Sequence, residues 1–437
     1  MEKREKFTSK LGFVTACIGS AIGLGNIWMF PYRLGRYGGA AFLIPYLIFV
    51  IILGSTGLIT EFSFGRKYAG GSMTGIVTIF KEKHRRFGRF VGMLPAVGLA
   101  GIFMFYNIVV GWILKYFGMS ITGKLKTVDK DTFFNSFAGT GASVPWDILA
   151  VVITVLIICA GVINGIERIS KIIMPALFII FAALAVRSVT LPGAAEGVKF
   201  LLMPKWEYLL KADTWIMALG QAFFTVSVNG CGMVVYGSYL KKEYDIPKLA
   251  LSTAVLDTLA ALLASFVIMP AVFAFGVDLK AGPPLLFMTM PVIFDQMPGG
   301  RVIAVIFFLS LLFAAVSSSI NMLEGVVEAV ISNTRLTRKR AVFLVGAVLC
   351  VLSVPLNLSM SAFDSFTNMI TIVVSPLAAL LVVFVFYYMG DAKEALREMN
   401  LGASVKMKRP FLILAKYIFT AVTILVVILG VVYGGIG

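Results

Sequence analysis

Eleven long apolar stretches follow one another along the chain, separated by shorter polar connections. A helix needs roughly 20 residues to cross the ~30 Å hydrocarbon core of a bilayer. A basic start, MEKREKFTSK, leads directly into the first stretch, and the length of that stretch argues against a cleaved signal peptide. The pattern predicts an all-α polytopic membrane protein with eleven transmembrane helices, at 11–33, 41–64, 90–118, 147–165, 171–191, 214–238, 249–276, 301–331, 341–356, 364–389 and 411–434.

Two of these stretches contain residues that suit a continuous helix poorly. They are GSAIGLGN at 19–26 and SVNGCG at 227–232. Within lipid every backbone N–H and C=O needs a partner, so non-helical backbone is tolerated only where it lines a cavity. Two Gly-interrupted segments in corresponding positions of two halves indicate the substrate and ion site of a secondary transporter. The two halves, segments 1–5 and 6–10, are therefore expected to form an inverted repeat.

The charge distribution gives an orientation. The net charge is +16, and 26 of the 38 Lys and Arg residues fall in the N-terminal tail and on the side of the membrane that this tail shares. Such a bias marks the cytoplasmic side, so we expect a cytoplasmic N-terminus and an external C-terminus in a bacterial inner (plasma) membrane. The basic excess thus reflects topology and not binding of nucleic acid.

The remaining chemistry argues against an enzyme. All four cysteines lie in apolar stretches, and the single histidine, His84, lies in a basic loop, so neither a disulfide framework nor a transition-metal site is expected. No nucleophile with a base is apparent. A channel would need a continuous polar pore or a charged ring, and the polar positions within the stretches are isolated.

A broken helix exposes free carbonyls on one side of the break and free amides on the other. The carbonyls suit a cation and the amides suit a carboxylate, so a zwitterionic amino acid fits both. A sodium ion is expected to use Asn26 and Thr225 oxygens, a carbonyl of segment 1 and the Asp257 carboxylate. A second cation is expected between segment-1 carbonyls and Ser317 with Ser318. Neutral oxygens favour Na⁺ over H⁺, although proton coupling stays an alternative.

Four stretches of the chain carry a resemblance to a known family. The stretches 19–32 (GSAIGLGNIWMFPY), 221–227 (QAFFTVS), 256–258 (LDT) and 314–318 (AAVSS) are similar to signatures of the neurotransmitter:sodium symporters. The likeness runs in order from about residue 4 to the end. It implies a LeuT-type fold with a 5+5 inverted repeat, helices 1 and 6 unwound at mid-membrane, alternating access and Na⁺-driven amino-acid uptake.

The resemblance also implies domain boundaries and site residues. The domains are a cytoplasmic tail 1–10, a first repeat 11–191, an external loop 192–213, a second repeat 214–389, and a cytoplasmic linker with helix 11 at 390–437. One Na⁺ site is implied at Ala21, Asn26, Thr225 and Asp257, and a second at Gly19, Ile22, Ala314, Ser317 and Ser318. The implied substrate residues are Ser20, Ala21, Leu24, Gly25, Ile102, Tyr106, Phe224, Thr225, Ser227, Gly230, Ser318 and Met322. The implied gating residues are Arg4, Phe7, Tyr239, Tyr106, Phe224, Gly165 and Pro175, of which Gly165 and Pro175 match an unwinding motif.

The chain departs from the family pattern at both ends of the pathway. Met29 stands where the family usually has an external gate arginine, and its acidic partner aligns with Asp364 or Thr367, so a largely apolar and aromatic external gate is expected. On the cytoplasmic side Ser332 replaces the acidic partner of Arg4, and Glu328 is the expected substitute.

Two further departures bear on the substrate and on chloride. Gly230 stands where some relatives carry a bulky aromatic residue, which predicts an enlarged pocket for tyrosine, tryptophan, phenylalanine or leucine. Ala261 lacks the serine of chloride-dependent relatives, and together with the Asp257 charge this predicts chloride independence. The alternative is a transporter of the same fold for another small amine or a nucleobase. A monomer or weak dimer is expected.

Two further predictions concern Glu61 and the connection between segments 4 and 5. Glu61, near the cytoplasmic end of segment 2, is interpreted as a helix-end ion pair with Arg66 or Lys67. Segments 4 and 5 are expected to be joined by the connection 164–171, which contains Gly165.

Overall fold

The computed structural model describes residues 5–277 and 282–435, and the predicted gating residue Arg4 lies outside them. Within those residues every regular element is helical. The first half contains α1 (Lys10–Ala21), η1 (Gly25–Met29), α2 (Phe30–Arg36), α3 (Ala40–Phe49), η2 (Val50–Gly54), α4 (Ser55–Tyr68), α5 (Ser72–Glu82), α6 (Gly88–Thr122), η3 (Lys124–Thr127), α7 (Lys130–Phe137), α8 (Val144–Cys159), η4 (Val162–Glu167), α9 (Arg168–Val189), α10 (Ala194–Leu202) and η5 (Trp206–Leu210).

The second half is also helical. It contains α11 (Ala212–Thr225), α12 (Gly232–Ser238), α13 (Ile246–Phe275), η6 (Leu285–Thr289), α14 (Met290–Gln296), α15 (Gly300–Asn333), α16 (Arg338–Asn357), α17 (Met360–Met369), η7 (Ile370–Val374), α18 (Ser375–Phe384), η8 (Val385–Met389), α19 (Ala392–Met399), α20 (Arg409–Ile413), η9 (Leu414–Ile418) and α21 (Phe419–Tyr433). The elements named η are short π-helical turns, except η3 and η5, which are 3₁₀ turns.

Eight helices in the described residues are long and apolar enough to cross a membrane, and nine if the bent pair formed by α1 and η1–α2 is one span. The other two predicted spans, 147–165 and 214–238, fall below that length for different reasons. The first corresponds to α8, which has only 16 residues. The second is divided between α11 and α12, with non-helical backbone between Thr225 and Gly232.

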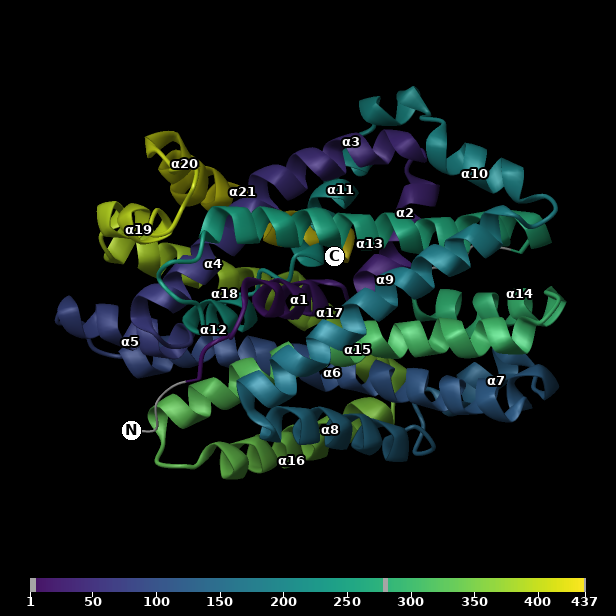
Figure 1. The fold of residues 1–437 in the computed structure, drawn as a ribbon, viewed down its shortest axis with the longest axis horizontal. Coiled ribbons are helices and arrows are strands. Elements are labelled where there is room, and N and C mark those ends of the chain that lie inside the picture. The colour runs from purple at the N-terminus through teal and green to yellow at the C-terminus, as the bar shows by residue number, and fades with distance from the viewer. Residues whose placement is uncertain (1–4, 278–281, 436–437) are drawn as a thin grey trace.

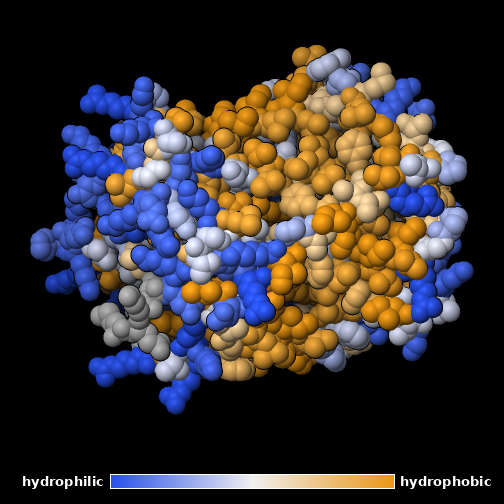
Figure 2. Space-filling view, viewed as in Figure 1, coloured by the Kyte–Doolittle hydropathy of each residue, from blue (hydrophilic) through white to orange (hydrophobic). Residues whose placement is uncertain are grey.

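An apolar band crosses the middle of one face of the molecule. Figure 2 shows this band between two hydrophilic ends, and the hydrophilic side chains are denser at the end where α5, α19 and the start of the chain lie in Figure 1. The long helices α6, α13 and α15 run from one end to the other, and α1 lies among them (Figure 1). Such a band matches the hydrocarbon region of a bilayer.

The connection between α8 and α9 differs from the sequence prediction. The chain turns at Gly161, which has a φ of +91°, and helix resumes at Val162, so residues 164–171 are helical and are not a loop. A Cβ on Gly165 would lie 2.1 Å from the Ile157 carbonyl oxygen. Gly165 therefore permits the start of this helix to pack against the end of α8, a role that local composition does not reveal.

Close backbone contact joins α4 to α12. A Cβ on Gly65 would lie 1.9 Å from the Val234 carbonyl oxygen, and one on Gly237 would lie 2.5 Å from Phe62 Cα. Small residues permit such approaches between membrane helices. This contact fixes α12, and with it the preceding interruption, against α4.

Candidate functional site

The first interruption lies between α1 and η1. Helix α1 ends at Ala21, Ile22 is extended, and the two helices on either side are bent by 60°. The Ile22 amide still bonds to the Ile18 carbonyl at 2.7 Å. Because α1 ends here, the carbonyls after Ile18 have no amide of the same helix to accept from, and they face other elements.

The second interruption lies between α11 and α12. Ser227 and Gly230 have φ values of +54° and +75°, so the backbone turns through the left-handed region twice. The Asn229 side-chain oxygen accepts from the amides of Cys231 and Gly232 at 3.1 and 3.0 Å. Asn229 thus supplies acceptors to amides that would otherwise be unsatisfied at the start of α12.

Three serine hydroxyls converge on the free carbonyls of the first interruption. Ser317 Oγ donates to the Gly19 carbonyl at 2.7 Å. Ser318 Oγ lies within 3.2 Å of the carbonyls of Gly19, Ser20 and Ile22. Ser227 Oγ, from the second interruption, donates to the Ser20 carbonyl at 2.9 Å. Residues from α1, α11–α12 and α15 therefore meet at one place, with oxygen atoms predominating.

A buried carboxylate lies beside this cluster. Asp257 on α13 has 0% exposure. Thr225 Oγ1 donates to its Oδ2 at 2.6 Å, and Asn26 Nδ2 donates to its Oδ1 at 2.8 Å. Both partners are neutral. An ionised carboxylate buried at this depth is costly without a nearby positive charge, so the group suits a cation.

The donor set fits a hard cation after one rearrangement. Asn26 now directs its nitrogen toward Asp257 and its oxygen toward the Gly23 amide at 3.2 Å. A half-turn of this amide would direct the oxygen toward Asp257 and Thr225. Carboxylate, amide, hydroxyl and carbonyl oxygens are the ligands that Na⁺ and other hard cations take. Residues around Asp257 can therefore hold Na⁺.

Tyr106 directs its hydroxyl toward the same interruption. A Cβ added to Gly23 would lie 3.3 Å from Tyr106 Oη and 3.5 Å from Ser318 Oγ. This hydroxyl is buried and makes no hydrogen bond of normal geometry to the described residues, and the Ser318 hydroxyl and the Leu24 amide lie near it. A buried unpaired donor costs stability, which argues for a ligand that accepts from it.

Apolar side chains flank these polar groups. Ile102 lies one turn before Tyr106, Phe224 lies three residues before Ser227, and Met322 lies one turn after Ser318. All three are partly exposed, unlike the fully buried core around them. The four-residue spacing puts Ile102 and Met322 on the same helix faces as Tyr106 and Ser318, and Phe224 lies at the end of α11, directly before the second interruption. These side chains can form the wall of an amino-acid pocket.

Comparison with known proteins identifies the family. The sequence model of the sodium:neurotransmitter symporter family matches residues 4–144 and 134–434. The chain is 36% identical over 422 residues to the uncharacterized sodium-dependent transporter YhdH of Bacillus subtilis, covering 92% of each protein. It belongs to the sodium:neurotransmitter symporter family.

Two other similarities support this. An uncharacterized sodium-dependent transporter of Haemophilus influenzae is 32% identical over 354 residues, covering 78% of this chain and 77% of that protein. The crystal structure of MhsT in complex with L-phenylalanine superposes with a TM-score of 0.85 at 33% identity, covering 98% of this chain and 100% of that one. The protein is thus a sodium-dependent symporter with the fold of MhsT, and not an enzyme.

Glu61 of this symporter corrects one sequence interpretation. It is not part of a helix-end ion pair, because Arg66 pairs with Glu398 at 2.6 Å and Lys67 with Glu394 at 2.7 Å. Instead Glu61 Oε1 accepts from the Gly230 amide at 2.8 Å. The carboxylate supports the second interruption from α4, across 169 residues of sequence.

The structure also corrects the prediction that Gly230 enlarges the substrate pocket. In this symporter a Cβ at position 230 would lie 2.3 Å from the Ala378 carbonyl oxygen, on α18. The glycine is required by its left-handed backbone and by the close approach of α18. Its lack of a side chain therefore does not enlarge the substrate pocket.

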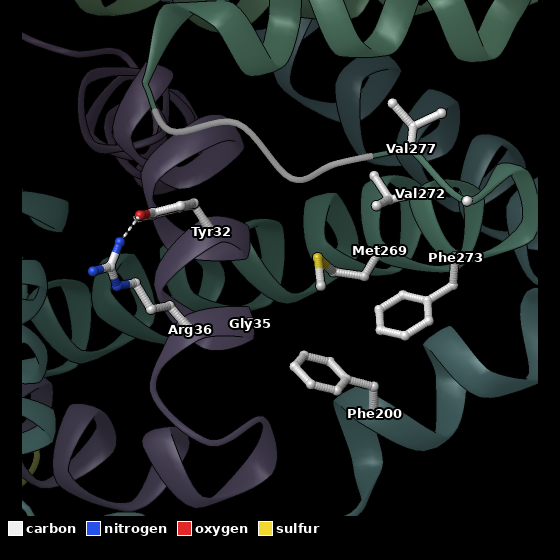
Figure 3. A pocket seen from close by; sticks show the side chains of 9 residues that line it. Tyr32, Gly35, Arg36, Phe200, Met269, Val272, Phe273 and Val277 are labelled. Carbon is white, nitrogen blue, oxygen red and sulfur yellow. Dashed lines mark hydrogen bonds between the residues drawn. The ribbon is translucent and has the colours of Figure 1, made fainter.

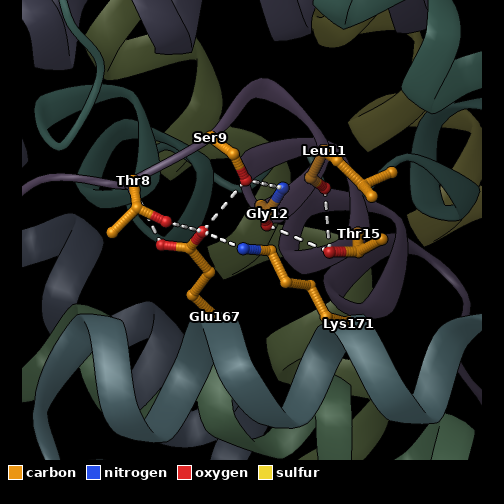
Figure 4. Close-up of polar contacts among 7 residues, drawn as sticks. All are labelled: Thr8, Ser9, Leu11, Gly12, Thr15, Glu167 and Lys171. Atoms are coloured by element: carbon orange, nitrogen blue, oxygen red, sulfur yellow. Dashed lines mark hydrogen bonds and ion pairs between the residues drawn. The ribbon is translucent and has the colours of Figure 1, made fainter.

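The end of the symporter at which the basic loops lie is closed by the start of the chain. Phe7 is buried against Phe13, Tyr236 and Tyr239, and its amide bonds to the Tyr239 carbonyl at 3.3 Å. Figure 4 shows the next contact, in which Thr8 and Ser9 donate to the Glu167 carboxylate, with Lys171 paired to it at 2.6 Å.

Sequence reasoning missed the ion pair that supports this closure. Tyr239 Oη donates to Glu324 Oε1 at 2.5 Å, and Arg338 bonds to both oxygens of Glu324 at 2.9 and 2.7 Å. Glu328, the expected partner of Arg4, accepts from Ser332 at 2.7 Å. A carboxylate inside a predicted span was an available signal for Glu324.

An arginine also lies at the opposite end. Arg33, one turn after Met29, is buried, and its Nη1 donates to Gln221 on α11 at 3.0 Å. A buried guanidinium therefore lies one turn beyond Met29, and the largely apolar and aromatic external gate stays a prediction. The position of the guanidinium is shifted by one turn, which preserves the helix face.

A separate cavity opens beside α2. It has a volume of about 580 Å³ and lies between α2, α10 and α13. Figure 3 shows Arg36 bonded to Tyr32 on one side and the rings of Phe200 and Phe273 on the other. None of the predicted substrate or sodium residues lines it.

Proposed function

We propose that this symporter takes up a hydrophobic or aromatic amino acid, namely phenylalanine, tyrosine, tryptophan or leucine, by alternating access. Two Na⁺ ions drive the uptake, without a requirement for chloride. The observation that carries the proposal is the convergence of oxygen ligands from three helices on the first interruption. The neutral surroundings of the buried Asp257 carboxylate add to it.

Two sodium sites follow from the contacts. The first uses the Asp257 carboxylate with Thr225, Asn26 and the Ala21 carbonyl. The second uses Ser317 and Ser318 with carbonyls of α1 and of Ala314, and Ser317 already donates to the Gly19 and Ala314 carbonyls at 2.7 and 2.8 Å. A cation at the second site would accept oxygen lone pairs from both serines and so would turn their hydroxyl protons elsewhere.

The amino acid is proposed to lie between the two interruptions. Its carboxylate would accept from the unpaired Tyr106 hydroxyl and from the Leu24 and Gly25 amides, close to the first sodium. Ile102, Phe224 and Met322 would surround its side chain. Their apolar character and the phenylalanine in the MhsT complex support a hydrophobic or aromatic substrate.

Chloride independence and topology complete the proposal. The Asp257 charge near the first sodium supplies the negative charge that chloride would otherwise bring, and Ala261 offers no hydroxyl. Eleven spans, with helices 1 and 6 unwound and two inverted halves, fit the interruptions. The cytoplasmic N-terminus and the bacterial inner membrane fit the dense hydrophilic end in Figure 2. A monomer or weak dimer is proposed.

The test is equilibrium binding of labelled phenylalanine, tyrosine, tryptophan and leucine to the purified protein in Na⁺ and in K⁺, with chloride replaced in parallel. Binding is expected in Na⁺ only and is expected to be unchanged by chloride replacement. Asp257→Asn removes the charge without changing the shape, and it should raise the Na⁺ requirement at least tenfold, roughly 1.4 kcal/mol.

Asp391→Asn is the matched control, because Asp391 is an exposed carboxylate that caps α19 away from the site. It should bind like the unaltered protein. Binding that is equal in Na⁺ and K⁺ would contradict sodium coupling and favour protons. Binding of none of the four amino acids would contradict the substrate assignment.

A further inference from the structure

A closed network of buried polar side chains lies behind the site, among α6, α8, α15 and α16. Its centre is the Asp147 carboxylate, in the first turn of α8 and 1% exposed. Asn107 Nδ2 donates to its Oδ1 at 3.1 Å, while Ser353 Oγ and Asn357 Nδ2 donate to its Oδ2 at 2.6 and 2.7 Å. All three partners are neutral, so hydrogen bonds hold this carboxylate and not an ion pair.

The network reaches the site through two residues. Asn107 directly follows Tyr106 on α6, and Ser319 directly follows Ser318 on α15. Ser319 Oγ donates to Asn107 Oδ1 at 3.0 Å, which joins the two helices. Adjacent helical residues point about 100° apart, so Tyr106 and Ser318 face the first interruption while their neighbours face the network.

The charge of Asp147 sets the direction of these bonds. An ionised carboxylate only accepts, so Asn107 must direct its nitrogen to Asp147 and its oxygen to Ser319. The Asp147 carbonyl accepts from the same nitrogen at 3.3 Å. With a neutral amide at position 147, the Asn107 amide would be free to turn over and present its nitrogen to Ser319. The carboxylate therefore orders the bonds from α16 through to α15.

We propose that Asp147 and Asn107 are positioning residues for sodium and substrate binding. They hold α6 and α15 in the relative position at which the Tyr106 hydroxyl and the Ser317 and Ser318 hydroxyls meet at the first interruption. This inference rests on the proposed function. Groups that orient metal ligands without touching the metal commonly change its affinity about 10–100-fold, and the same is expected here.

The experiment measures the Na⁺ concentration for half-maximal binding of labelled phenylalanine, together with thermal stability. Asp147→Asn should raise that concentration about tenfold. The exchanged pair Asn107→Asp with Asp147→Asn restores the side-chain bonds between positions 107 and 147 and the acceptor for Ser319, and loses only the longer bond to the backbone carbonyl of residue 147. It should return to within about twofold of the unaltered protein. Ser120→Ala is the matched control, because Ser120 is a buried hydroxyl on α6 that bonds only within its helix.

Each outcome decides between the alternatives. Unchanged Na⁺ dependence in Asp147→Asn, or failure of the exchanged pair to restore it, overturns the inference. If Asp147→Asn does not fold, Ser319→Ala takes its place, because it removes the bonds of α15 to Asn107 and to Thr154 and leaves the carboxylate intact. It should shift the Na⁺ requirement in the same direction. Absence of sodium-dependent binding in the unaltered protein removes the proposed function itself. If the unaltered protein binds phenylalanine in a sodium-dependent way and the variants show the same Na⁺ dependence, only this inference is removed.

Discussion

At the scale of single residues, the site is recognised by groups whose bonding is incomplete. The Tyr106 hydroxyl is buried without a partner among the described residues, and the Asp257 carboxylate is buried against neutral donors. Unmet bonding of this kind costs free energy in the empty protein. The same groups therefore stabilise the protein when a carboxylate and a cation bind to them.

Tyr106→Phe tests this directly. A hydrogen bond to a charged group is worth about 1.5–3 kcal/mol, so phenylalanine affinity should fall roughly 10–100-fold. The melting temperature of the ligand-free protein should not fall, since the lost hydroxyl has no protein partner. A lower melting temperature with unchanged affinity would mean that the hydroxyl serves the fold and not the substrate.

At the scale of elements, glycines determine how closely the helices approach. The α4–α12 contact at Gly65 positions the second interruption, and Glu61 on the same helix bonds to the Gly230 amide there. Gly165, a predicted gating residue, permits a similar approach between η4 and α8. Whether Gly165 and Pro175 also permit unwinding during transport stays a prediction.

Gly65→Ala tests the close contact. Its Cβ would lie 1.9 Å from a backbone oxygen, so α12 must shift, and overpacking of this kind costs about 1–3 kcal/mol. The melting temperature in detergent should fall, with weaker amino-acid binding. Gly118→Ala is the control, because its Cβ would meet nothing nearer than Trp146 at 3.9 Å, and it should leave both measurements unchanged or slightly improved.

At the scale of the whole molecule, contacts between distant segments hold shut the end at which the basic loops lie. Phe7 packs on α12, Tyr239 joins α12 to Glu324 on α15, and Arg338 joins Glu324 to the start of α16. Glu5 accepts from the Val162 amide at 2.5 Å, which adds the start of η4. Opening of this end must break several of these contacts together.

Glu324→Gln should loosen that end. The amide cannot accept both the Arg338 bonds and the Tyr239 bond, so α12 and the start of the chain lose support. Hydrogen exchange of the amides of residues 5–12 should become about tenfold faster, roughly 1.4 kcal/mol. Glu394→Gln, which changes a more exposed carboxylate at the same end, should not alter it. Equal exchange in both variants would show that the Glu324 pair does not hold the end closed.

The sequence by itself determined the membrane class, the two interruptions and the resemblance to the family. These depend on local composition and on short ordered motifs, such as GSAIGLGN and QAFFTVS, which survive without knowledge of packing. The sequence also singled out Asp257, because a carboxylate within an apolar stretch is costly and conspicuous.

Only the tertiary structure decided which residues become partners. Glu61 meets Gly230, Arg33 meets Gln221 and Asp147 meets Asn357 across 169, 188 and 210 residues. In a membrane protein the lipid is as apolar as the core, so hydrophobic periodicity does not reveal which face of a helix packs inward. Pairings between faces therefore appear only once the helices are arranged, as they did for Arg33, for the Glu324–Arg338 ion pair and for the network around Asp147.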